Sequence, residues 1–171
     1  MNAAVVPCEP PVLRAGDGFL EALGTLLVRH GLTLRTVGAD EPIPGSYWGE
    51  PEAGLIATTV WARPDTPVHS VLHEACHAIC MDRKRRAHLE RDAGGSDLEE
   101  NAVCCLQILL ADQLPGVGSA RLMADMDSWG YTFRLGAARA WYEREADDAR
   151  AWLAGHGLVD GAGRPTSRMR A

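Results

Sequence analysis

Two histidines four positions apart, His73 and His77, are the feature that most constrains this chain. In an α-helix, residues at i and i+4 lie on one face, so this spacing directs both imidazoles toward one point. Glu74 follows the first histidine and completes a His-Glu-x-x-His pattern. That pattern is typical of helices in which two imidazoles bind Zn²⁺ and the carboxylate takes a proton from a water molecule.

The residues around the motif predict a helix from about Thr66 to Met81. Thr66 is a typical N-cap residue, and Pro67 follows it in the first helical position, where its missing N–H costs nothing. No Gly or Pro follows before the predicted end. Apolar residues recur at helical spacings, namely Val71, Leu72, Ala75, Ala78 and Ile79. The stretch from Leu55 to Trp61 is rich in β-branched residues and predicts a strand just before this helix.

A second predicted helix offers a third ligand, because catalytic zinc is usually held by three protein side chains and one water molecule. This helix begins at Ser96 or Asp97 and ends near Pro115. Glu99 lies at the head of its apolar stripe, where a carboxylate is costly unless something compensates its charge. We therefore expect Glu99 to bind the metal. The stripe consists of Ala102, Val103, Leu106 and Leu110.

Other roles remain open for the two glutamates of this helix. Ser96 and Glu99 form a capping-box pattern, in which the glutamate bonds back to the Ser96 N–H. Asp97 and Glu100 repeat that pattern one residue later. Glu100 is the alternative ligand, and a third possibility is that neither glutamate binds metal. The helix face of Glu100 mixes polar and apolar residues and holds Cys104, Gln107 and Ala111.

Two groups of residues near the motif have alternative roles. Cys76 and Cys80 are four apart on the first helix, and Cys104 and Cys105 lie on the second, so a structural zinc site of Cys and His ligands is conceivable. We expect these cysteines instead to be small core residues. The basic run at residues 83–86 is expected to be a solvated loop, with substrate docking as the alternative.

The remaining segments predict one α+β domain over residues 1–171. A helix from Asp17 to His30 precedes a strand at 32–37, and residues 46–48 and 55–62 are expected to form two more strands joined by a turn. These strands form a small, mostly antiparallel sheet against the motif helix. A short helix at 119–126 and a long one from Phe133 to Ala154 follow. Residues 1–12 and 160–171 are expected to be flexible.

Composition excludes several classes of protein. The chain has no run of 18 apolar residues, which argues against a membrane span, and its start lacks the pattern of a signal peptide. Five cysteines without disulfide-framework spacing favour a reducing compartment. A net charge of −6 argues against general nucleic-acid binding. We therefore expect a cytoplasmic protein without nucleic-acid or membrane partners.

His73-Glu74-x-x-His77, followed by a helix reading Glu99-x-x-Ala102-x-x-Cys105-Leu106-x-x-Leu109-Leu110, resembles the ImmA/IrrE-type zincins. Their second helix typically reads E-x-x-A-N-x-F-A-x-x-L-L-M-P. The chain differs from it at Val103, Cys105 and Ala111-Asp112, and the resemblance covers roughly residues 45–115. It implies a divergent zincin-like fold and a cytosolic zinc-dependent endopeptidase with a glutamate as third ligand, which often acts on a regulatory protein.

The sequence thus predicts a zinc metallopeptidase. His73, His77 and Glu99 bind Zn²⁺, and Glu74 is the general base. The donor that stabilises the oxyanion is one of His69, His88, Tyr47 and Tyr131. A peptide or protein substrate is expected along the strand from Leu55 to Trp61, by β-addition. The alternative function is a non-catalytic zinc-binding domain that serves protein interaction or regulation.

Overall fold

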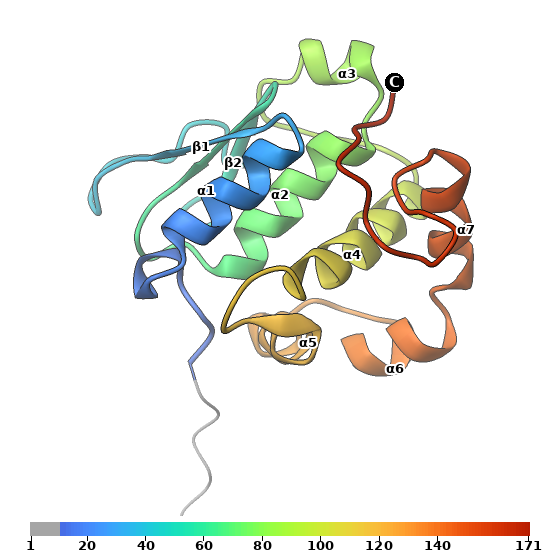
Figure 1. Cartoon of the computed structure of the whole chain (residues 1–171). Coiled ribbons are helices and arrows are strands. Elements are labelled where there is room, and N and C mark those ends of the chain that lie inside the picture. Colours follow the sequence, from blue (N-terminus) through green and yellow to red (C-terminus); the bar gives the residue numbers. More distant parts are fainter. Residues whose placement is uncertain (1–10) are drawn as a thin grey trace, which may run out of the picture.

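Helix α2 (Val68–Cys80) is the central element of the fold, and all of its residues except His73 are buried. The computed structural model describes residues 11–171 (Figure 1). The helix begins directly after Pro67, but the expected cap is wrong, because no side chain caps this end. The hydroxyl of Thr66 instead accepts a hydrogen bond of 2.8 Å from the backbone N–H of Arg63, inside the preceding turn.

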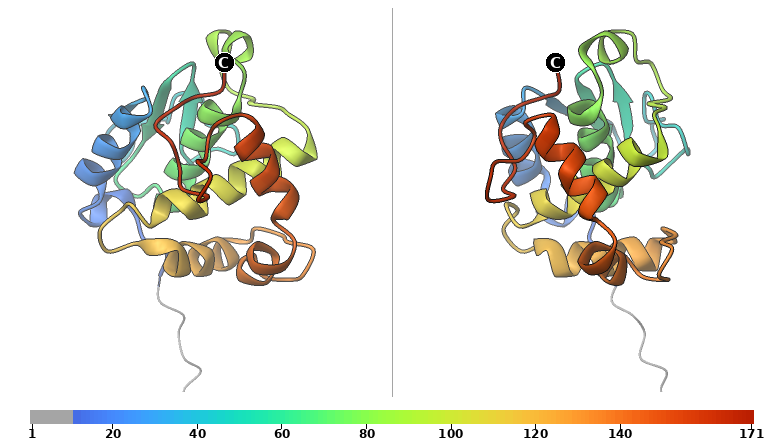
Figure 2. Two further views of the ribbon diagram at one scale, coloured as in Figure 1. Left: turned by 45° about the vertical axis from the view of Figure 1, so that its right-hand side comes forward. Right: turned by 90° about the vertical axis from the view of Figure 1, so that its right-hand side faces the viewer.

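A three-stranded mixed sheet lies beside α2. Its order is β1 (Thr33–Thr36), β3 (Thr59–Ala62), β2 (Gly54–Ile56), with β1 parallel and β2 antiparallel to β3. A short 3₁₀ helix (Ala15–Asp17) precedes α1 (Leu20–Arg29), and α1 and α2 cover the same face of the sheet (Figures 1 and 2). The described domain is therefore α+β as expected, but the sheet is mixed rather than mostly antiparallel.

The single strand expected from Leu55 to Trp61 is a tight hairpin. Ala57 and Thr58 form its turn, and Ala57 has a positive φ of 51°. β3 is paired on both sides, so it has no free edge for a peptide. The outer edge of β2 is also occupied, since Leu55 N–H donates to Gly45 O at 3.4 Å and Ala57 N–H to Leu89 O at 3.0 Å. The turn contains no Gly or Pro, and this is why the pattern predicted one strand. The strand expected at 46–48 is reduced to an isolated bridge at Ser46.

Helices form the second half of the fold. α4 (Asp97–Ala111) crosses α2 and packs against it, and also contacts α5 (Gly118–Trp129) and α7 (Asp147–Gly155). The long helix expected from Phe133 to Ala154 is wrong, because the chain breaks between α6 (Ala138–Arg144) and α7. At the break Ala146 is fully buried, while Glu145 accepts hydrogen bonds of 3.0 Å from Arg134. Figure 2 shows α7 turned away from α6 and lying beside α4.

The basic run after α2 is not a solvated loop. It forms α3 (Arg83–Ala87), which Asp82 caps by accepting a 2.9 Å hydrogen bond from the N–H of Arg85. Arg86 is buried and donates to the carbonyl oxygens of Ala78 at 2.7 Å and Met81 at 2.6 Å. Its guanidinium thus satisfies carbonyl groups at the C-terminal end of α2, which have no partners within the helix.

The C-terminal segment, expected to be flexible, is held against the same end of α2. Arg170 N–H donates to Ile79 O at 2.9 Å, and Arg170 O accepts a 2.6 Å hydrogen bond from Arg86. Figure 1 shows this segment running across α2 to the C-terminus. At the other end of the chain, Leu13 N–H donates to Asp125 at 2.9 Å; residues 1–10, also expected to be flexible, lie outside the described residues.

Candidate metal centre

His73 and His77 meet at their Nε2 atoms, which lie 3.1 Å apart. Their rings are perpendicular, with centroids 4.6 Å apart. The apolar residues between and around them anchor α2 between the sheet and α4, so the helix fixes both ring positions. The structure therefore brings together the two histidines as their spacing predicted.

Glu100 is the carboxylate that joins the two histidines. One of its oxygens lies 3.2 Å from Nε2 of His73 and the other 3.4 Å from Nε2 of His77. These three side chains form a group whose potential ligand atoms all lie within 4.8 Å of one another. Ligands bound to zinc at 2.0–2.1 Å in a tetrahedron are separated by about 3.3–3.4 Å. The observed separations of 3.1, 3.2 and 3.4 Å, the last two to different oxygens of Glu100, are close to this spacing.

Glu99, the expected third ligand, lies elsewhere. It is buried as its position on the apolar stripe predicted, but its carboxylate accepts hydrogen bonds from Arg85 at 2.9 and 3.0 Å and from Arg170 at 3.2 Å. These two cations, rather than a metal, compensate the buried charge. Ser96 caps α4 by accepting a 3.2 Å hydrogen bond from the N–H of Glu99. The next residue, Glu100, then points toward the histidines, so Glu100 replaces Glu99 in the candidate site.

Gln107 orients His73. Its side-chain oxygen lies 2.7 Å from Nδ1 of His73, in the buried contact between α4 and α2. An amide oxygen only accepts hydrogen bonds, so Nδ1 carries the proton and donates it. Gln107 was not predicted as a site residue, although it shares the face of α4 that carries Glu100, seven residues earlier. That shared face was the available signal in the sequence.

The two imidazoles differ in their affinity for protons. Burial and the charge of His73 lower the pKa of His77 to about 4. Burial also disfavours the charged form of His73, but Tyr131, Cys104 and Glu100 around it outweigh this effect and raise its pKa above the usual value. His77 therefore presents a neutral imidazole at pH 7, the form that binds metals.

Glu74 lies on α2 between the two histidines and is 8% exposed. Burial raises the pKa of this carboxyl to about 7; the negative charges of Glu52 and Glu100 act in the same direction, and the charge of His73 opposes them. A carboxylate whose proton affinity is close to neutrality suits a general base. The role of Glu74 as the general base, expected from the motif, stays a prediction.

Glu52 is a further acidic residue at the site, and the sequence did not single it out. Its carboxylate accepts hydrogen bonds from the hydroxyl of Ser70, one turn before Glu74 on α2, and from the indole N–H of Trp129 at the end of α5. Ser70 also accepts a 2.9 Å hydrogen bond from Ala53 N–H. These contacts tie the segment before β2 to α2 and α5.

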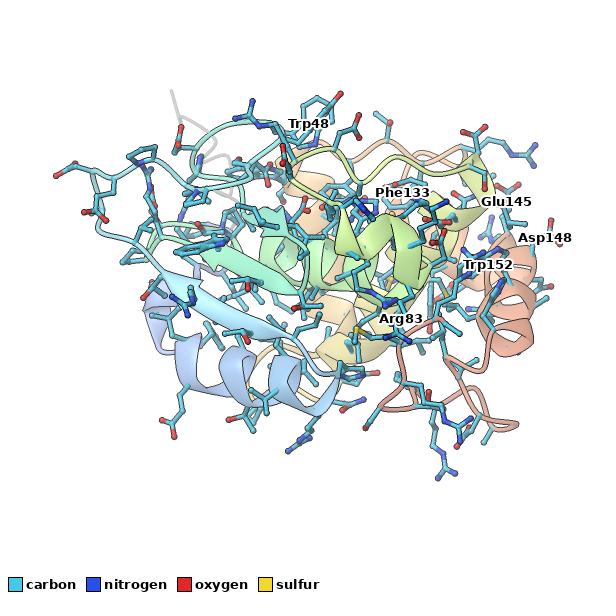
Figure 3. All side chains as sticks on the ribbon, turned by 90° about the horizontal axis from the view of Figure 1, so that it is seen from above. Trp48, Arg83, Phe133, Glu145, Asp148 and Trp152 are labelled. Carbon is cyan, nitrogen blue, oxygen red and sulfur yellow. The ribbon has the colours of Figure 1, made fainter. Side chains whose placement is uncertain are left out.

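Of the four candidate oxyanion donors, Tyr131 lies beside the group. Its ring is perpendicular to that of His73, at a centroid distance of 5.7 Å. His69 is fully buried behind it, against Trp129 and Tyr131. His88 and Tyr47 are exposed. In Figure 3, Phe133, which stacks on Tyr131, lies on the same side of the molecule as the exposed Trp48.

The cysteines of α2 and α4 are buried and free, as a core role requires. Burial raises the pKa of the thiols of Cys76 and Cys80, and raises that of Cys105 to about 11. Within residues 11–171, the group that could hold a metal contains no cysteine. A cysteine zinc site therefore has no support in this part of the chain.

Comparison with protein-family models, with curated proteins and with solved structures finds no match to this chain. In the described part of the chain, none of the helices combines the length and apolar character needed to cross a membrane. The residues of the candidate site are therefore the basis on which a function can be proposed.

Proposed function

We propose that this protein is a zinc-dependent peptidase in which His73, His77 and Glu100 hold the ion and Glu74 is the general base. The observation that carries this proposal is the convergence of two imidazole nitrogens and one carboxylate at separations of 3.1 to 3.4 Å. Glu74 lies on the same helix between the two histidines.

The donor set fits zinc better than magnesium or calcium, because two of its three ligands are imidazole nitrogens. The hydrogen bond from His73 Nδ1 to Gln107 keeps a proton on Nδ1, so the ion would displace the proton of Nε2, the atom that faces His77 and Glu100. Metal-binding histidines usually donate their second ring N–H in this way, which fixes the tautomer and the ring orientation. Three protein ligands leave one position for water or substrate, as catalytic sites require.

When bound, zinc would lower the pKa of a water molecule and polarise the carbonyl group of a peptide. Glu74 accepts the proton of the attacking water and then delivers it to the leaving amine. The hydroxyl of Tyr131 is the candidate donor to the oxyanion, since its ring contacts His73. Gln107 and the packing of α2 against α4 hold the two histidines in position beside Glu100.

The proposal is tested by metal content and by hydrolysis of a proteome-derived peptide library, with cleavage products identified by mass spectrometry. We expect the wild type to bind one equivalent of zinc and to cleave the library. Glu74→Gln should keep the zinc and lose at least about 100-fold in rate, because it removes only the proton acceptor. Glu90→Gln, an exposed change of the same kind, is the control.

Three results would contradict this assignment. Failure of the wild type to bind zinc would remove the metal centre. Stoichiometric zinc without any cleavage would favour a non-catalytic zinc-binding domain. Full activity in Glu74→Gln would exclude Glu74 as the base, even if the wild type were active.

A further inference from the structure

Glu52 is an acidic side chain at the candidate site, and no cation in the described part of the chain forms an ion pair with it. Its two oxygens are held by neutral donors, the hydroxyl of Ser70 and the indole N–H of Trp129. Within residues 11–171, Glu52 takes part in none of the ion pairs. These donors fix the position of the carboxylate and leave its charge available to a partner from outside.

The two neutral donors place Glu52 close to the reacting groups. Ser70 lies four residues before Glu74 on the same face of α2, a rise of about 6 Å along the helix. Trp129 packs on His69, with ring centroids 5.4 Å apart, and His69 in turn contacts the ring of Tyr131. The negative charge of Glu52 acts electrostatically on both Glu74 and Tyr131. Glu52 therefore lies in the neighbourhood of the base, through its hydrogen bond to Ser70 one turn before Glu74.

Two arginines in this part of the molecule have other partners. Arg85 binds Glu99, and Arg14 lies over the Trp129 ring, 5.6 Å from its centroid, and donates to Asp65 O. Neither guanidinium forms an ion pair with Glu52. A positively charged group on a substrate would thus meet Glu52 without having to displace a protein cation.

The loop that carries Glu52 offers a second feature that attracts cations. Tyr47 and Trp48 are 52% and 77% exposed and pack edge to face, with ring centroids 5.1 Å apart. The loop is closed at its base, because the hydroxyl of Ser46 donates to Glu52 O at 3.1 Å. Exposed aromatic faces attract ammonium and guanidinium groups. Figure 3 shows Trp48 at the edge of the molecule, on the side where Phe133 lies.

We propose that Glu52 selects substrates that carry a cationic nitrogen next to the bond that is cleaved. This nitrogen belongs to a lysine or arginine side chain or to a free α-amine. The inference rests on the proposed peptidase function and adds its substrate class. Glu52 acts by an ion pair with the substrate, while Ser70 and Trp129 hold it in place.

The experiment compares the zinc-loaded wild type with Glu52→Gln on the peptide library, intact and with its amines acetylated. We expect the residues next to cleaved bonds to be enriched in Lys or Arg, or cleavage to concentrate at free N-termini. Glu52→Gln should lower the rate on cationic peptides by about 10- to 100-fold, the effect of a lost charged hydrogen bond, and leave neutral peptides within about 2-fold. Acetylation should remove the preference if the α-amine or lysine is recognised, and leave cleavage beside arginine.

Glu50→Gln is the matched control, because it removes the same charge from the same loop at an exposed position. Equal rate losses on cationic and neutral peptides in Glu52→Gln, with an unchanged melting temperature, would overturn the inference. A wild type that shows no cationic preference would do so as well.

A binding measurement separates failure of this inference from failure of the proposed function. Fluorescence anisotropy of the zinc-loaded protein compares a lysine-containing peptide with the same peptide containing norleucine. One outcome is that the wild type cleaves nothing yet binds the lysine peptide at least about 10-fold more tightly than the norleucine peptide. If Glu52→Gln then loses this difference in affinity, Glu52 forms a cation site in a protein without peptidase activity. Equal binding of the lysine peptide, the norleucine peptide and the norleucine peptide with an acetylated N-terminus to the wild type would reject the cation site.

Discussion

The side-chain oxygen of Gln107 accepts a hydrogen bond from Nδ1 of His73, across the contact between α4 and α2, at 2.7 Å. Through it, the helix that carries Glu100 also orients a histidine of the other helix. One packing contact thus sets both the position of the carboxylate and the tautomer of His73.

Replacing Gln107 by leucine should weaken zinc binding by about 10- to 100-fold, because His73 loses the acceptor that fixes its ring. Gln107→Glu keeps an acceptor and should recover most of the affinity. Competition with a chromogenic chelator measures this change. Gln113→Leu, at an exposed position just after α4, is the control. Wild-type affinity in Gln107→Leu would mean that packing alone orients His73.

Glu99→Ala and Glu100→Ala should have opposite effects. Glu100→Ala removes a ligand and should abolish stoichiometric zinc binding, with little effect on the stability of the zinc-free protein, because this side chain is 48% exposed. Glu99→Ala should retain zinc but lower the free energy of unfolding by about 2 kcal/mol, since it leaves Arg85 and Arg170 without their buried partner. Metal analysis and urea unfolding measure the two effects. Loss of zinc from Glu99→Ala alone would restore Glu99 as the ligand.

Tyr131→Phe should lower kcat by about 100-fold and leave KM and zinc affinity nearly unchanged, because it removes one hydroxyl donor and keeps the ring against His73. Steady-state kinetics on a cleaved library peptide separate kcat from KM. Tyr47→Phe, at an exposed ring, is the control. A rise in KM with unchanged kcat would assign Tyr131 to substrate binding instead.

The buried thiols should resist alkylation in the native protein. Because burial raises the pKa of Cys105 to about 11 and also raises those of Cys76 and Cys80, few thiolates form at pH 8. Iodoacetamide should label these three residues at least about 100-fold more slowly than it labels the urea-unfolded chain. Mass spectrometry in a Cys8→Ser variant measures each site separately. Rapid native labelling of Cys76 would show that α2 and α4 separate readily.

Local patterns predicted most of the elements and failed where tertiary contacts override them. Apolar periodicity predicts the helix around His73, and β-branched content predicts the strand at residues 33–36. The turn at Ala57 was missed because it contains no Gly or Pro. The break before α7 was missed because burial of Ala146 leaves no strong sequence signal. The C-terminal segment was expected to be flexible because it is rich in Gly, Arg and Ser. The structure anchors it on Arg86 and Ile79, which lie far away in the sequence.

His73 and His77 share a helix face with Glu74 beside them, and residue spacing alone predicts this, because the helical repeat fixes that relation locally. The apolar stripe likewise predicts that Glu99 is buried. What compensates the charge of Glu99 depends on contacts between distant segments, since Arg85 and Arg170 come from α3 and the C-terminal segment. While these two arginines hold Glu99, the crossing of α4 over α2 brings Glu100 to the two histidines. The choice between adjacent carboxylates depends on how two helices pack, and no spacing within either helix contains that information.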